Sequence, residues 1–76
     1  MYTDAMKRAF HAVQAPKGFS VQLIDNDHFL TVKLDERHFA GLLYEEKVAA
    51  LQYVVQLKKA LEMEGAIVLV TREVAK

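Results

Sequence analysis

The spacing of apolar residues changes along the chain, and this change constrains the fold more than any single motif. Between residues 6 and 13 apolar side chains recur at every third or fourth position, after Thr3 or Asp4 as a helix N-cap. This spacing predicts an amphipathic helix of about three turns. Pro16 and Gly18 end it, because proline disfavours the helical conformation of the preceding residue and glycine permits a turn.

Apolar and polar residues alternate between positions 19 and 34, which predicts a β-hairpin. With Asn26–Asp27 as a two-residue turn, the apolar residues of the two strands pair with one another on one face of the sheet. Ile24 and Phe29 then lie opposite each other on the otherwise polar face, next to the turn.

The segment from about residue 43 to 64 predicts a helix some 30 Å long, reached through a connection at residues 35–41. Its apolar residues form two stripes, so we expect two packing partners. The stripe expected against the sheet holds Ala50, Tyr53, Val54, Leu57, Ala60 and Leu61. The stripe expected against the N-terminal helix holds Tyr44, Val48, Leu51 and Val55.

Gly65 is placed to end this helix, and residues 66–72 predict a strand. A strand, a helix and a further strand imply a right-handed crossover, so the last strand should be parallel to one of the first two. We therefore predict a single α+β domain over residues 1–76. Its elements follow the order α-β-β-α-β, with a three-stranded mixed sheet and two helices packed on one face.

This arrangement leaves the other face of the sheet uncovered, with apolar side chains on it. The last strand supplies one of two sets to that face, either Ile67 and Leu69 or Val68 and Val70. Exposed apolar patches usually mark protein contacts. The candidates for a protein-contact surface are Ile24, Phe29, Ile67 and Leu69.

Charge and composition argue against several classes of function. Ten Lys and Arg residues balance ten Asp and Glu residues, whereas strong nucleic-acid binders usually carry a basic excess. A weak basic patch remains as a nucleic-acid candidate, because it lies where the long helix begins: Arg37, His38 and Lys47. The absence of cysteine excludes disulfides, zinc knuckles and thiol nucleophiles. The longest apolar run has five residues, far below the ~18 of a membrane span, and the N-terminus is unlike a signal peptide, so we expect a cytoplasmic protein.

Catalytic and metal-binding residues are scarce. Ser20 is the only serine and lacks the Gly-x-Ser-x-Gly pattern of a nucleophile elbow. His28 and His38 have carboxylates beside them in sequence, a grouping that suits a metal or acid-base chemistry. However, residues 25–27 (Asp-Asn-Asp) also have the composition of a tight turn, and the chain has no His-x-x-x-His pair. We therefore expect no enzyme activity, metal site or cofactor.

Several short segments between His28 and Thr71 resemble the BolA-like family, whose members have a class II KH-like α/β topology. The similar segments are His28-Phe29, Phe39-Ala40-Gly41-Leu42, Lys47 eight residues after Phe39, and Ala66-Ile67-x-Leu69-x-Thr71. The resemblance implies the fold and, in the family, DNA binding and an iron-sulfur cluster shared with a monothiol glutaredoxin. The cluster ligands have no counterpart here, because Gly65 stands at the histidine position and the loop is reduced to residues 25–27. In the family's Arg-His-Arg motif only Lys47 is similar, since Val48 and Ala49 follow it.

Three hypotheses follow. The first is a small non-enzymatic binding module that acts through protein contacts, including self-association. The second is a nucleic-acid-binding regulator of KH or BolA type that uses the weak basic patch. The third, which has the least support, is a small enzyme or metal carrier centred on His28 and His38.

Overall fold

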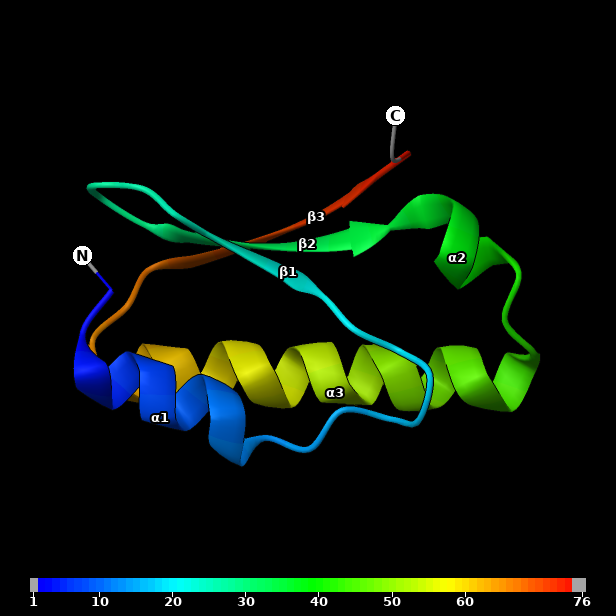
Figure 1. Ribbon diagram of the computed structural model, residues 1–76, viewed down its shortest axis with the longest axis horizontal. Coiled ribbons are helices and arrows are strands. Elements are labelled where there is room, and N and C mark those ends of the chain that lie inside the picture. The colour runs from blue at the N-terminus through cyan, green and yellow to red at the C-terminus, as the bar shows by residue number, and fades with distance from the viewer. Residues whose placement is uncertain (1, 75–76) are drawn as a thin grey trace.

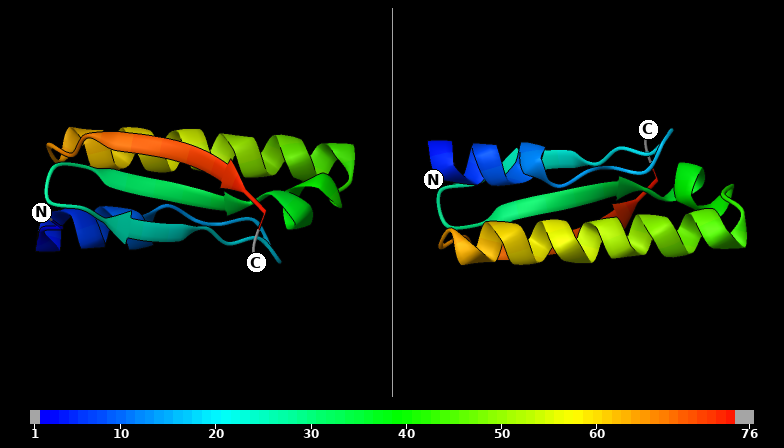
Figure 2. Two further views of the ribbon diagram at one scale, coloured as in Figure 1. Left: turned by 90° about the horizontal axis from the view of Figure 1, so that it is seen from above. Right: turned by 90° about the horizontal axis from the view of Figure 1, so that it is seen from below.

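The computed structural model describes residues 2–74, which form three helices and three strands. Their order is α1 (Asp4–Ala12), β1 (Gln22–Asp25), β2 (Leu30–Asp35), α2 (Glu36–Ala40), α3 (Tyr44–Met63) and β3 (Val68–Glu73). The strands form one mixed sheet, and α1 and α3 lie side by side on one of its faces (Figure 1; Figure 2). The predicted α+β class and three-stranded mixed sheet are confirmed, and α2 adds a five-residue helix within the predicted connection.

Helix α1 begins where the sequence predicts, because the Thr3 hydroxyl oxygen accepts a hydrogen bond from the backbone N–H of Met6 at 3.1 Å. Met6 is buried and is the residue of α1 that reaches deepest into the core. The chain then turns at Gly18, whose φ of +78° lies in the region that only glycine adopts without strain.

The hairpin between β1 and β2 has a different register from the predicted one. Leu23 pairs with Val32 and Asp25 with Leu30, and the N–H of Asn26 donates to the carbonyl of Phe29 at 2.9 Å. The loop therefore spans residues 26–29, and the predicted two-residue turn at Asn26–Asp27 is wrong. A shift of two positions keeps every side chain on its predicted face, because the strand repeat is two residues. Because of this shift, Phe29 does not lie opposite Ile24 as predicted.

Strand β3 pairs in parallel with β2 at the other side of the sheet. Before it, α3 ends in a Schellman motif: Gly65 has a φ of +91°, its N–H donates to the carbonyl of Glu62, and the N–H of Ala66 donates to that of Leu61. Val68 is buried opposite Leu30, so Ile67 and Leu69 are the set that faces away from the helices. The predicted strand begins two residues later than expected, at Val68.

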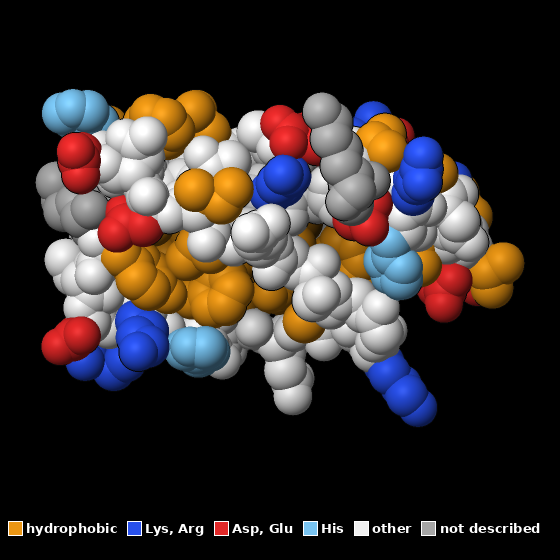
Figure 3. Space-filling model, turned by 45° about the horizontal axis from the view of Figure 1, so that its top comes forward, with side chains coloured by type: hydrophobic (Ala, Val, Ile, Leu, Met, Phe, Trp, Pro, Cys, Tyr) orange, Lys and Arg blue, Asp and Glu red, His pale blue; other side chains and the backbone are white. Residues whose placement is uncertain are grey.

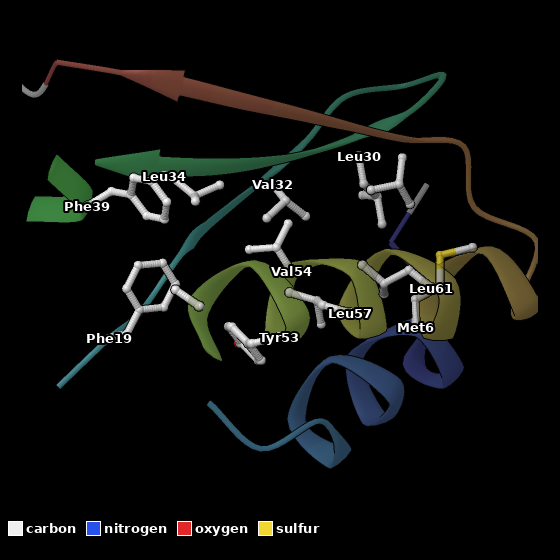
Figure 4. Packing of buried hydrophobic residues seen from close by; sticks show 12 residues of the cluster. Met6, Phe19, Leu30, Val32, Leu34, Phe39, Tyr53, Val54, Leu57 and Leu61 are labelled. Carbon is white, nitrogen blue, oxygen red and sulfur yellow. The ribbon is translucent and has the colours of Figure 1, made fainter. Parts of the chain in front are cut away.

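The core lies between the sheet and the two long helices (Figure 4). Leu30, Val32 and Leu34 of the central strand point toward the helices and are almost fully buried. They meet the stripe of α3 that was predicted to face the sheet, whose buried members are Ala50, Tyr53, Val54, Leu57 and Leu61. Met6 of α1 lies beside Leu61 (Figure 4).

The second apolar stripe of α3 is not covered by α1, contrary to the prediction. We call it the outer flank of α3: Tyr44, Val48, Leu51 and Val55. At 100° per residue, Leu51 and Val55 each lie about 160° around the helix from Tyr53, which belongs to the buried core. Because α1 packs against the core stripe together with the sheet, the outer flank remains at the surface.

Candidate protein-contact surface

The open face of the sheet, which is the face opposite α1 and α3, carries a row of apolar side chains across all three strands. Ile24 on β1 pairs with Thr31 on β2, and Thr31 pairs with Leu69 on β3. Paired residues of neighbouring strands project from the same face, so these three side chains stand next to one another. Two of the predicted contact residues, Ile24 and Leu69, are thus brought together around a threonine.

The other two predicted contact residues, Phe29 and Ile67, lie two positions before Thr31 and Leu69 in the chain, just outside the strands. Phe29 precedes β2 in the hairpin loop, and Ile67 precedes β3, where its carbonyl accepts from the N–H of Leu30 at 2.8 Å. Both residues, together with Met6 of α1, line a small cavity of about 60 Å³ between the hairpin loop and the chain after α3. Two residues of strand correspond to roughly 7 Å, so this pair adjoins the row of Ile24 and Leu69. Phe29 is half-buried there.

Exposure distinguishes these residues from the core. Ile24, Ile67 and Leu69 expose 40%, 64% and 48% of their surface, whereas Val68, between the last two, exposes 4%. No helix or strand within residues 2–74 lies over the open face (Figure 1; Figure 2). In Figure 3, where the sheet side is tilted toward the viewer, hydrophobic side chains reach the surface in several places between polar and charged ones.

Polar residues continue the open face toward the far ends of β2 and β3. Gln22 pairs with Lys33, Lys33 pairs with Thr71, and the ammonium group of Lys33 lies 3.0 Å from a carboxylate oxygen of Glu73. The face therefore has an apolar half near the hairpin loop and a charged half near α2. This division resembles the apolar centre and polar rim of protein interfaces.

The three residues of the predicted basic patch lie on α2, for Arg37 and His38, and near the start of α3, for Lys47. Two of these side chains have internal partners. A ring nitrogen of His38 hydrogen-bonds the carbonyl oxygen of Gly18 at 3.0 Å, and the ring stacks on Phe19 with centroids 6.0 Å apart. The ammonium group of Lys47 lies 6.0 Å from the centre of the Phe39 ring. Arg37 is exposed in α2.

Arg72 of β3 is a further basic residue near this site, and it is not one of the residues of the predicted basic patch. Its guanidinium group lies 5.2 Å from the centre of the Phe39 ring and 3.2 Å from a carboxylate oxygen of Glu36. Phe39 is therefore approached by two cations, Lys47 and Arg72, and both contacts pack α2 against the ends of α3 and β3. In the sequence, this contact is indicated by the aromatic residue at position 39 and not by a cluster of basic residues.

The histidines proposed as a metal or acid-base pair do not meet. His28 lies in the hairpin loop and His38 in α2, at opposite ends of the six-residue strand β2. That strand alone separates them by about 20 Å. Across residues 2–74, no three His, Asp or Glu side chains are grouped so that they could hold a metal ion.

None of the helices formed by residues 2–74 is both long and apolar enough to cross a membrane.

No protein-family model matches this chain, and neither a curated protein nor a solved structure is significantly similar to it. The resemblance to the BolA-like family remains a prediction made from short sequence segments.

Proposed function

We propose that this chain is a small non-enzymatic module that binds another protein through the apolar half of the open face. The observation that carries the proposal is the row formed by Ile24, Thr31 and Leu69, which exposes two large aliphatic side chains on a sheet face without a covering layer in residues 2–74. Burial of such surface is worth roughly 25 cal/mol per Å² before the costs of association. The polar half of the same face supplies groups that orient a partner.

The shape of the surface supports protein as the ligand rather than a small molecule. The cavity beside Phe29 and Ile67, at about 60 Å³, is far smaller than the roughly 300–1,000 Å³ of typical small-molecule pockets, and the hollow lined by Gln22, Lys33 and Glu73 in the polar half measures about 280 Å³. A flat sheet face with aliphatic side chains at its centre suits a second flat surface, such as a helix or a sheet of another protein.

The nucleic-acid alternative has weaker support. The element that carries Arg37 and His38, α2, and the start of α3, which carries Lys47, lie at the same end of the sheet, which favours it (Figure 1). However, His38 and Lys47 already contact Gly18 and Phe39, and the N–H of Leu43 at the start of α3 donates to the Glu46 carboxylate at 2.8 Å. A carboxylate at that position repels a phosphate group.

A capture experiment with two matched variants tests the proposal. Immobilised wild-type protein, Leu69→Ser and Leu51→Ser are each exposed to an extract of the cells that contain the protein. Leu69 and Leu51 have nearly equal exposure, 48% and 46%, but lie on the open face and on α3 respectively. We expect a partner that the wild type and Leu51→Ser retain and that Leu69→Ser loses. Identical sets of captured proteins for all three would contradict the proposal.

A further inference from the structure

We infer that a second copy of this chain binds the outer flank of α3, and that the two α3 helices pack antiparallel around a two-fold axis beside Leu51. The inference goes beyond the proposed contact on the open face, because it concerns a different surface and a different partner. It rests on the spacing of the flank residues, on the distribution of charge along α3 and on the exposed area of the molecule.

The outer flank has the spacing of a helix–helix seam. Tyr44, Val48, Leu51 and Val55 are separated by four, three and four residues, the alternation that keeps one stripe facing a partner helix. Val48, Leu51 and Val55 expose 38%, 46% and 50% of their surface, and they line a shallow hollow together with Gln52, Gln56 and Lys59. A stripe with this spacing, on a helix whose other side packs in the core, suits contact with a second helix.

Charge along the flank favours a second copy in antiparallel orientation. Glu45 lies in the first turn of α3 and Lys59 near its end, both exposed and on the same side of the flank. In an antiparallel pair centred beside Leu51, Glu45 of each copy lies next to Lys59 of the other, and Val48 lies next to Val55. The chain also has no net charge, so two copies do not repel each other as a whole.

The flank is accessible to another molecule. Figure 2 shows α3 and β3 along one long edge of the molecule, and α1 and β1 along the other. Leu51 and Val55 are about half exposed, so a second α3 can reach them without displacing any described element.

The molecule exposes more surface than a compact monomer of its mass would expose. The molecule exposes 5373 Å². A compact monomer of this mass, 8.6 kDa, would expose about 4,700 Å². The difference of about 700 Å² is close to the roughly 800 Å² that each partner loses in a standard-size interface.

Sedimentation of charge-reversal variants tests the inference. Within one molecule Glu45 and Lys59 are about 21 Å apart along the helix, well beyond the ~8 Å screening length at 0.15 M salt. Glu45→Lys or Lys59→Glu alone should raise the dimer dissociation constant roughly three- to tenfold, because two ion pairs become repulsions. The double variant E45K/K59E should restore the wild-type value, which only a contact between copies explains.

Leucine variants separate this inference from the proposed function. Leu51→Ser should raise the dissociation constant about tenfold or more, whereas Leu69→Ser should leave dimerisation unchanged. A wild-type chain that remains monomeric at about 0.5 mM would overturn the inference, as would a double charge variant that fails to recover. Neither result would affect partner capture through the open face. Conversely, if the wild type dimerises and E45K/K59E restores its dissociation constant, the inference holds even if Leu69→Ser captures the same proteins as the wild type.

Discussion

Ile24 and Leu69 stand on either side of Thr31 in a single row across the open face, although they belong to the two opposite edge strands of the sheet. Neither residue is needed to fill the core, which lies on the other face between the sheet, α1 and α3. Large aliphatic side chains in such positions carry a cost in solubility unless they are covered in a complex. This relationship is the basis of the proposed protein contact.

The hydrogen bond between His38 and Gly18 predicts a stability difference between two histidine variants. His38→Ala removes a bond of 3.0 Å and a stacking contact with Phe19, so the free energy of unfolding should fall by about 1 kcal/mol. His28→Ala alters an exposed loop side chain and should change the free energy of unfolding by less than about 0.5 kcal/mol. Urea denaturation followed by circular dichroism measures both. Equal losses in the two variants would show that His38 does not hold α2 to the loop before β1.

The two glycines at the ends of helices predict opposite results. Gly65 has a φ of +91° with no atom within 4 Å of an added Cβ, so Gly65→Ala should cost roughly 1–2 kcal/mol through backbone strain alone. Gly41 has a φ of −81°, and an added Cβ would make ordinary contacts at 3.6 Å. Gly41→Ala should therefore be neutral or slightly stabilising. Thermal unfolding of the two variants side by side checks this difference.

The sequence predicted the sheet faces better than the strand pairing. Because side chains alternate with a period of two, a register shift of two residues left Ile24 and Leu23 on their predicted faces while lengthening the hairpin loop to residues 26–29. The turn-forming residues Asn26 and Asp27 suit either loop. The structure has the longer loop, closed by the hydrogen bond from the N–H of Asn26 to the carbonyl of Phe29, and no local sequence pattern distinguishes the two.

The position of α1 could not be predicted from its own amphipathicity. The sequence correctly indicates two apolar stripes on α3, but it does not indicate which stripe α1 shares with the sheet. Met6 enters the core beside Leu61, so α1 adds to the buried stripe and leaves Leu51 and Val55 exposed. In β3, the register with β2 places Val68 beside the buried Leu30 and leaves Leu69 on the open face.

Burial of Tyr53 predicts a loss of stability at high pH. Desolvation raises the pKa of the Tyr53 hydroxyl above its ordinary value. The pKa of Tyr2 is also raised, mainly by burial and further by the nearby carboxylate of Asp25. The unfolded chain therefore releases these protons first, near pH 10, and the free energy of unfolding falls as the pH rises above that value.

Two tyrosine variants check this pH dependence. Tyr53→Phe should reduce the fall in melting temperature between about pH 9 and 11 without removing it, because Tyr2 remains. Tyr44→Phe, which removes an exposed hydroxyl, is the matched control. A profile of Tyr53→Phe identical to that of the wild type would contradict the role assigned to burial.

The balanced charge of the chain predicts no significant nucleic-acid binding. Fluorescence anisotropy with labelled single- and double-stranded oligonucleotides at ~50 mM salt should show no complex at micromolar protein. Binding that weakens steeply with salt and is lost in Arg37→Ala would favour the nucleic-acid alternative instead. His28→Ala serves as the control, because that side chain lies at the other end of β2.

Photo-crosslinking from the open face tests the proposed protein contact most directly. A photoreactive residue is placed at position 69, and for comparison at position 11 on the exposed surface of α1, in cells that produce the full chain. We expect a covalent adduct of one defined mass with a partner protein from position 69, reduced by Ile24→Ser on the neighbouring strand, and none from position 11. Equal labelling from both positions, or no adduct from position 69, would contradict the account.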